Sequence, residues 1–185
     1  MGEHRSADAE VRISAEIPDW SREYPRQFWD PGPKLLLAIR QYQYWREKVG
    51  PFAFLACKWL ILRHRFWSVV SGAEIPLNCR IGGGLVIWHP NGIVIHPGAR
   101  IGVNCLIFQQ VTIGIRNGPG LPELGGHVDI GAGAKILGPV RIGDHAKIGA
   151  NAVVISDVPS GAVATGVPAR VNTISGVAIR DAVSL

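Results

Sequence analysis

Residues 73–114 read AEIPLNCRIGGGLVIWHPNGIVIHPGARIGVNCLIFQQVTIG and carry the pattern that decides the fold. Aliphatic side chains recur in them every six positions, first at Ile75, Ile81 and Ile87 and, after a two-residue shift, at Ile95, Ile101, Ile107 and Ile113. The same spacing returns in residues 130–154, IGAGAKILGPVRIGDHAKIGANAVV, at Ile130, Ile136, Ile142, Ile148 and Val154. Because side chains alternate along a strand with a period of two, every sixth residue faces the same side. Each hexad can therefore form a short strand followed by a tight bend.

Three such hexads form one triangular coil of a parallel β-helix, with the repeated aliphatic residues filling its interior. The pattern predicts a mainly β domain of about four coils over residues 73–171, followed by a C-terminal tail, residues 172–185. The interruption at residues 116–128, RNGPGLPELGGHV, is rich in glycine and proline and predicts a loop at one corner. Loops on a regular scaffold are where function tends to lie.

The residues before the repeats differ in composition. Twelve of the 14 aromatic residues precede residue 71, and 20 of the 23 glycines follow it. Several prolines predict an extended or poorly ordered segment over residues 1–32, in which Trp20 and Trp29 are candidate anchors. Apolar positions at helical spacing predict an α-helical region over residues 33–72, with helices at 34–49 and 52–70. Two helices with aromatic faces must pack on another part of the protein.

The overall composition excludes several classes of protein. With 47% hydrophobic and 18% charged residues, the chain is not intrinsically disordered. A formal charge of +5, without a run of four basic residues or a recognition motif, gives no indication of a nucleic-acid partner. Much of the basic charge lies between Arg22 and Arg65. A solvated helix face is its simplest interpretation, and membrane contact has no other support in the sequence.

Cysteine spacing and apolar segments bear on metal binding and compartment. The three cysteines lie far apart, at Cys57, Cys79 and Cys105. This spacing suits neither a disulfide framework nor a zinc site, so we expect no bound metal. The N-terminal residues lack the apolar core of a signal peptide, and the apolar residues 51–70 include Lys58, Arg63 and Arg65, too many charges for a membrane span. We therefore expect a cytoplasmic protein.

The repeat region resembles the serine acetyltransferases, members of the hexapeptide-repeat, left-handed β-helix acyltransferases. The resemblance covers about residues 71–171 and rests on residues 73–114 together with IGAGAKILGPVRIGDHAKIGANAVVISDVPSGAVATGVPAR, residues 130–170. The spacing of Glu74, Ile81-Gly82, His89 and the shift after it resembles the serine acetyltransferase branch in particular. The resemblance implies an enzyme that uses acetyl-CoA as co-substrate with no permanently bound cofactor, and a homotrimer with its sites between neighbouring subunits.

Acetyl transfer from a thioester to an alcohol needs a base, a group that orients the base, and donors for the developing oxyanion. His89 suits the first role because imidazole titrates near neutrality and WHPNG interrupts the regular pattern. The family has its general base at this position. Glu74 stands where the family has an aspartate that is hydrogen-bonded to that histidine. The resemblance also implies that coenzyme A contacts the backbone at Ala132 and Ala150, and that Lys147 and Arg170 are partners for its phosphates.

The chain departs from the family at the residues that grip serine. The family has glutamate where this chain has Pro97, and an Arg-His pair where this chain has Gly120-Leu121. Without these charged groups, a sugar or glycan hydroxyl is the expected acceptor, with genuine serine O-acetyltransferase as the alternative. The short helical region favours a single trimer over the family's hexamer. We assign no role to His96, His145 or, although it could line a cleft, His127.

Two other classes of protein use or could use this scaffold. A γ-type carbonic anhydrase has the same prism but binds zinc through three histidines, and its paired histidines five residues apart are absent from the later repeats. A non-catalytic assembly module would have no need to keep His89 and Glu74. Both interpretations are therefore remote alternatives.

Overall fold

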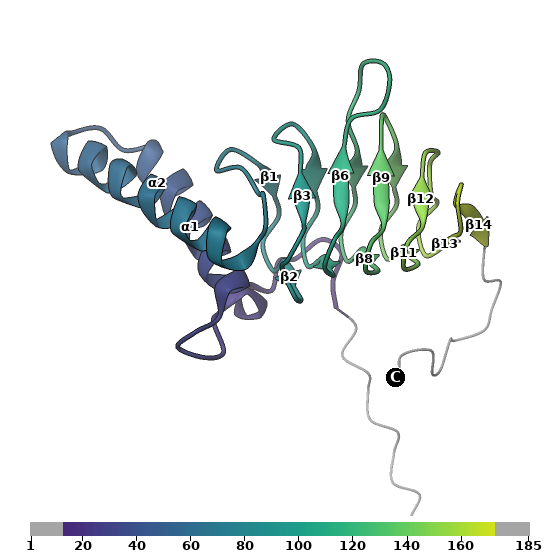
Figure 1. The fold of residues 1–185 in the computed structure, drawn as a ribbon, viewed down its shortest axis with the longest axis horizontal. Coiled ribbons are helices and arrows are strands. Elements are labelled where there is room, and N and C mark those ends of the chain that lie inside the picture. The colour runs from purple at the N-terminus through teal and green to yellow at the C-terminus, as the bar shows by residue number, and fades with distance from the viewer. Residues whose placement is uncertain (1–12, 173–185) are drawn as a thin grey trace, which may run out of the picture.

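The computed structural model describes residues 13–172, which form a triangular β-prism with a helical hairpin at one end (Figure 1). The helices are a 3-10 helix, η1 (Trp20–Glu23), and two α-helices, α1 (Pro31–Arg46) and α2 (Pro51–Ser71). The strands are β1 (Arg80–Ile81), β2 (Val86–Ile87), β3 (Val94–Ile95), β4 (Arg100–Ile101), β5 (Leu106–Ile107), β6 (Thr112–Gly114), β7 (Glu123–Leu124), β8 (Asp129–Ile130), β9 (Lys135–Leu137), β10 (Arg141–Ile142), β11 (Lys147–Ile148), β12 (Val153–Val154), β13 (Val163–Thr165) and β14 (Arg170–Asn172).

Each face of the prism is a parallel sheet in which strands from successive coils lie side by side. The sheets run β1-β4-β7-β10, β2-β5-β8-β11-β13 and β3-β6-β9-β12, and β14 closes the second sheet with an antiparallel pairing to β13. The predicted mainly β fold, a left-handed parallel β-helix of about four coils preceded by helices, is confirmed.

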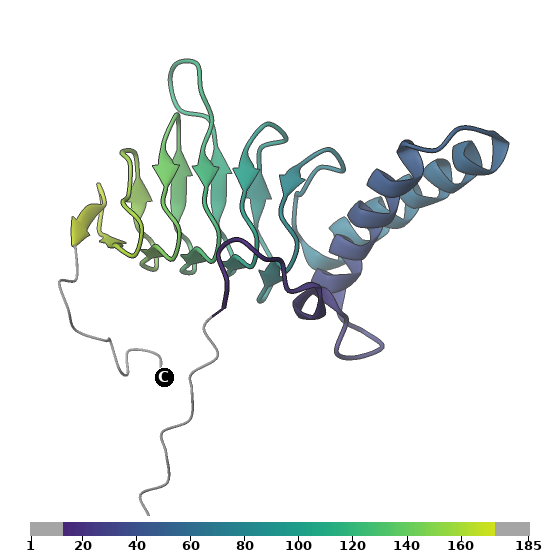
Figure 2. The ribbon, with the colours of Figure 1, turned by 180° about the vertical axis from the view of Figure 1, so that it is seen from behind.

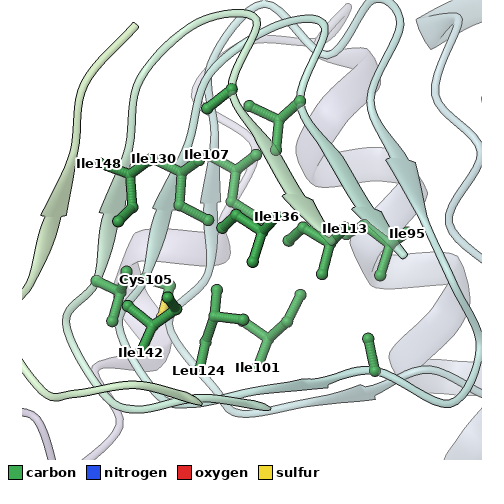
Figure 3. Close-up of a cluster of buried hydrophobic side chains, with 14 of the residues drawn as sticks. Ile95, Ile101, Cys105, Ile107, Ile113, Leu124, Ile130, Ile136, Ile142 and Ile148 are labelled. Atoms are coloured by element: carbon green, nitrogen blue, oxygen red, sulfur yellow. The ribbon is translucent and has the colours of Figure 1, made fainter. Parts of the chain in front are cut away.

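The core is a column of aliphatic side chains stacked in register along the prism. Ile101 pairs with Leu124 across one sheet and Ile107 with Ile130 across the next, so equivalent residues of successive coils lie one above another. Figure 3 shows these side chains converging from the three faces, with Cys105 among them. Ile107, Ile113 and their equivalents are buried. The burial of these apolar side chains stabilises so short a prism.

The loop in the middle of the chain is shorter than predicted. β6 ends at Gly114 and β7 begins at Glu123, so residues 115–122, not 116–128, leave the prism. Leu124 is in register with Ile101 and Ile142 and occupies a repeat position, six residues before Ile130. The prediction missed it because the residue is leucine and because the preceding spacing, from Ile113, is eleven.

The helices also begin at other residues than predicted. α1 starts at Pro31 and ends at Arg46, because proline in the first turn needs no N–H partner and its fixed φ suits a helix start. α2 ends at Ser71 and is followed by Gly72, whose φ of 66° is the left-handed conformation typical of a helix C-terminus. α1 buries Leu35 and Ile39 against α2 and the first coil, so the hairpin does pack on the β-helix.

The described part of the N-terminal segment lies along one corner of the prism rather than free of it (Figure 2). Asn104, which is fully buried, accepts from the Asp19 backbone N–H (2.8 Å) and donates to the Ser14 and Ile17 carbonyls (2.7 Å each). Trp20 covers Gly83, at which a methyl group would lie 2.7 Å from the indole ring. We call residues 13–23 the N-terminal strap.

A buried ion pair joins this strap to α1 and to the first coil. The Arg40 guanidinium donates to the Glu23 carboxylate at 2.8 Å and to the carbonyls of Ile81 and Gly82. Glu23 in turn accepts from the Leu85 backbone N–H at 3.1 Å. Because both charges are paired and hydrogen-bonded, their burial is compensated. Within residues 13–172, no helix combines the length and the apolar character needed to cross a membrane.

Candidate active site

His89 lies in an irregular corner between β2 and β3. The other turns of this corner each place one residue in the left-handed region, as at Gln110 (φ 58°), Gly133 (φ 73°) and Asn151 (φ 55°). The His89 turn contains two extra residues and two left-handed positions, Gly92 (φ 72°) and His89 itself (φ 51°). The insertion therefore takes the His89 side chain out of the regular stack of the corner. This side chain is exposed, and no residue of the described chain hydrogen-bonds to its ring.

Glu74 lies beside this corner at the start of the β-helix. It forms a parallel bridge with Val94: its N–H donates to the Ile93 carbonyl (2.8 Å), and its carbonyl accepts from the Ile95 N–H (3.0 Å). Its carboxylate is exposed and makes no hydrogen bond to His89 in the part of the chain that the structure describes. Glu74 and His89 thus lie at the same edge of the prism. The hydrogen bond by which Glu74 would orient His89 stays a prediction.

A cavity of about 340 Å³ opens beside His89. One wall is the corner itself, with Trp88 and His89. The other is formed by Arg22 of η1 and by the segment that joins η1 to α1, with Arg26 and Asp30. Two arginines and one aspartate thus line the same cavity as the candidate base. The sequence could not indicate this arrangement, because contacts between a proline-rich segment and a distant corner leave no periodic pattern.

Gln109 is a second feature that the sequence did not indicate. It lies on the same corner as His89, one coil further along, and its Oε1 atom is buried without a donor among residues 13–172. A buried acceptor without a partner is costly and rare. A bound molecule or a neighbouring protomer is a candidate source of the missing donor.

The residues predicted to bind coenzyme A lie toward the far end of the prism. Ala132 and Ala150 occupy the same corner as His89, two and three coils further along, and the Asn151 N–H donates to the Ala132 carbonyl at 2.8 Å. Lys147, on β11, is exposed and pairs in register with Asp129, and Arg170 is exposed on β14. The two alanines therefore lie along the same corner as His89, whereas the two cations lie on the adjoining sheet. Their roles stay predictions.

The positions at which the chain departs from the family lie together at a different corner, the one between β3 and β4. Leu121 covers this corner, because a methyl group at Gly98, next to Pro97, would lie 2.5 Å from its Cδ1 atom. A methyl group at Gly120 would likewise lie 2.5 Å from Pro139, one coil further along. Within one protomer this apolar surface is therefore separate from the corner of His89.

His127 and His145 meet at the third corner, one coil apart. Their Nδ1 atoms lie 2.8 Å apart, so one ring donates to the other. Burial is the main cause that lowers the pKa of His127 below its ordinary value of 6.5, and the charge of Asp129 opposes it. No group of three or more histidine, cysteine or acidic residues among residues 13–172 could hold a metal ion.

Comparisons with known proteins agree with this architecture. A family model described as bacterial transferase hexapeptide (six repeats) matches residues 122–156, the span of β7 to β12. A serine acetyltransferase of Synechococcus elongatus is 43% identical over 114 residues, 60% of this chain and 47% of that protein. A soybean serine acetyltransferase solved in complex with serine is 35% identical with a TM-score of 0.65, over 77% of this chain and 57% of that one. A serine acetyltransferase solved in complex with CoA is 33% identical with a TM-score of 0.66, over 78% of this chain and 58% of that one.

The repeated strands and the matching family model define a hexapeptide-repeat β-helix, similar to those of bacterial transferases. Within that group, the β-helix of this chain is similar to that of the serine acetyltransferases, the family that its sequence resembles. The chain spans about half the length of the Synechococcus elongatus relative, 47%.

Proposed function

We propose that the protein is an acetyl-CoA-dependent O-acetyltransferase and that its acceptor is L-serine. The observation that carries the proposal is the identity of 43% over 114 residues with a serine acetyltransferase, a stretch long enough to span most of the β-helix. Solved relatives in complexes with CoA and with serine support the two substrates. The sugar or glycan acceptor favoured by the sequence alone has no support from these relatives.

In the proposed reaction, His89 takes the proton of the serine hydroxyl while the oxygen attacks the thioester carbonyl. The tetrahedral intermediate then expels the coenzyme A thiolate, which receives the proton from the imidazolium, so one ester replaces one thioester. Glu74 would hold the imidazole and stabilise its charged form. The exposed position of His89, outside the regular stack of its corner, supports this role because a base must reach the hydroxyl directly.

The cavity beside His89 supports an acceptor that carries two charges. Arg22 and Arg26 could pair with a carboxylate and Asp30 with an ammonium group, replacing the groups missing at Pro97 and Gly120-Leu121. Arg22 already donates to the Asn104 carbonyl, and Asp30 accepts from the Arg26 N–H, so the wall that would hold the amino acid is itself anchored.

A sugar hydroxyl is the second candidate acceptor, and one observation favours it. The surface formed by Pro97, Gly98 and Leu121 is apolar where the resembled family carries charge. A neutral site binds hydroxyl groups through backbone and amide partners without an ion pair.

Competition between acceptors tests the proposal. With L-serine and a panel of free sugars and sugar nucleotides supplied together with acetyl-CoA, mass spectrometry of the products should show O-acetylserine as the main ester. Asp30→Asn should raise the KM for L-serine at least about tenfold while leaving the KM for acetyl-CoA unchanged, since it removes one charged partner. If any sugar had a higher specificity constant than L-serine, the proposed acceptor would be wrong and a carbohydrate would replace it.

A further inference from the structure

The outer face of α2 carries an apolar stripe that no other part of residues 13–172 covers. Its residues alternate in steps of three and four, the spacing that aligns side chains along one side of a helix. Each is at least 51% exposed, although each is a large apolar side chain. The α2 stripe consists of Phe52, Leu55, Trp59, Leu62, Phe66 and Val69.

The hairpin that carries the stripe also concentrates the positive charge of the protein. Residues 31–71 hold seven of the 19 basic residues and one of the 14 acidic residues, so the rest of the chain has 12 basic and 13 acidic residues. α2 itself has three basic residues and no acidic one. Lys58 and Arg65 border the stripe and are exposed, whereas Arg63 donates to Gln41 of α1.

We propose that the α2 stripe binds the surface of a membrane that contains anionic lipids. The hairpin projects obliquely away from the prism (Figures 1 and 2), and the stripe is exposed along α2 from Phe52 to Val69. At 1.5 Å per residue, the 21 residues of α2 provide an edge of roughly 30 Å. Tryptophan, phenylalanine and leucine on one side with lysine and arginine beside them is the composition of helices that lie in the lipid headgroup region.

The charges argue against a second copy of this chain as the occupant. Two α2 helices that packed stripe against stripe would bring Lys58 and Arg65 of one copy next to the basic residues of the other, with no acidic residue on either helix to compensate. On an anionic membrane the same two side chains reach the headgroups while their aliphatic stems cover the stripe. The charge pattern therefore disfavours packing of α2 against a second α2 and favours binding to an anionic membrane.

Flotation with vesicles tests this proposal on the full chain. The protein is mixed with vesicles of phosphatidylcholine alone or with about one third phosphatidylglycerol, and the bound fraction is measured at low and at physiological salt. One variant removes the apolar contact, Trp59→Ser with Phe66→Ser, and a second reverses the charge, Lys58→Glu with Arg65→Glu. Matched controls change equally exposed residues of the prism, Val167→Ser and Arg141→Glu.

We expect at least about tenfold stronger binding to the anionic vesicles, weakened by salt, and a loss of at least about tenfold in each double variant but in neither control. Equal binding to both vesicle types, or double variants that bind like the wild-type chain, would overturn the proposal. The proposal would also be overturned if the oligomer of the wild-type chain had a larger mass than that of the Trp59→Ser, Phe66→Ser variant. A second copy of the chain, and not a membrane, would then cover the stripe. The charge variant changes exposed positions only, so it remains a test if the apolar variant misfolds.

Discussion

His89 is the one residue of its corner whose left-handed conformation comes from the two-residue insertion rather than from the regular turn. A positive φ is uncommon for a residue other than glycine, although asparagine and histidine adopt it more readily than most, as His127 and His145 do at the third corner. Its side chain is exposed and borders a cavity that charged residues line. The cavity beside it and a ring that makes no hydrogen bond in the described chain support a functional role for His89 more than its φ does.

Replacing His89 should separate catalysis from binding. We expect His89→Ala to lower kcat by about 10²–10⁴, the range for loss of a general base, with little change in acetyl-CoA affinity. Glu74→Gln should lower kcat less, because it removes orientation and charge but keeps the base. His96→Ala is the matched control, since His96 only accepts the Gly98 N–H at the next corner. Steady-state kinetics and calorimetric binding measure both effects, and a His89→Ala variant with half the wild-type kcat would contradict the mechanism.

The His127–His145 pair should make the stability depend on pH. Burial lowers the pKa of His127, so the unfolded chain binds a proton at its ordinary value near 6.5 before the folded chain does. The free energy of unfolding should therefore fall as pH drops below about 6.5. Urea denaturation over a range of roughly one pH unit on either side of this value measures the slope. His127→Asn should flatten it, and an unchanged slope would rule out this origin.

Two of the three cysteines should be unreactive in the folded protein. Burial raises the pKa of Cys79 to about 12 and that of Cys105 to about 11, so both are neutral thiols at pH 7. Cys57 on α2 is only partly buried. Alkylation by iodoacetamide under native conditions should label Cys57 alone, and labelling of all three should require denaturant. Peptide mapping distinguishes these patterns, and rapid native labelling of Cys105 would contradict the packing of the core.

At the level of the elements, the corners of the β-helix do more than turn the chain. One corner carries His89, Ala132 and Ala150, the second carries the loop 115–122, and the third binds the N-terminal strap through Asn104. The strap then leads directly into the segment that walls the cavity beside His89. Its attachment therefore links the stability of the fold to the shape of the site.

Asn104→Ala should destabilise the protein by about 1–3 kcal/mol, because the Ser14 and Ile17 carbonyls and the Asp19 N–H lose their partner. Gln110→Ala is the matched control: it has nearly the same left-handed φ, 58° against 57°, but its exposed side chain holds no strap. Chemical denaturation gives the difference in free energy of unfolding. Equal losses in the two variants would mean that the backbone conformation, not the strap, is responsible.

The sequence predicted the strands of the repeats and the two helices, which have periodic patterns, and missed features that have none. A period of six predicts a β-helix because it fits neither the 3.6-residue period of an α-helix nor the two-residue alternation of an uninterrupted strand. The family resemblance suggested His89 as the base. The repeat position of Leu124 was missed because the irregular loop before it interrupts the six-residue spacing. The strap escaped because its hydrogen bonds join residues about 90 positions apart, from Ser14 to Asn104, and such contacts depend on the folded shape. The cavity with Arg22, Arg26 and Asp30 depends on the same contacts.

For the molecule as a whole, a narrow prism with flat faces invites association of three copies. The site of one protomer is open on the side of His89, and the apolar surface around Leu121 lies at another corner, where a neighbour's His89 could meet it. We expect native mass spectrometry at micromolar concentration to give three times the chain mass of 19.9 kDa. A monomer would contradict the proposed shared sites, whereas six copies would contradict only the single trimer.

The proposed chemistry, serine acetylation with His89 as the base, is best tested by the release of coenzyme A thiol from acetyl-CoA with and without L-serine. We predict thiol release that depends on L-serine, one O-acetylserine formed for each thiol, and loss of both with His89→Ala. Thiol release that is the same without L-serine, or that persists at the wild-type rate in His89→Ala, would contradict this chemistry.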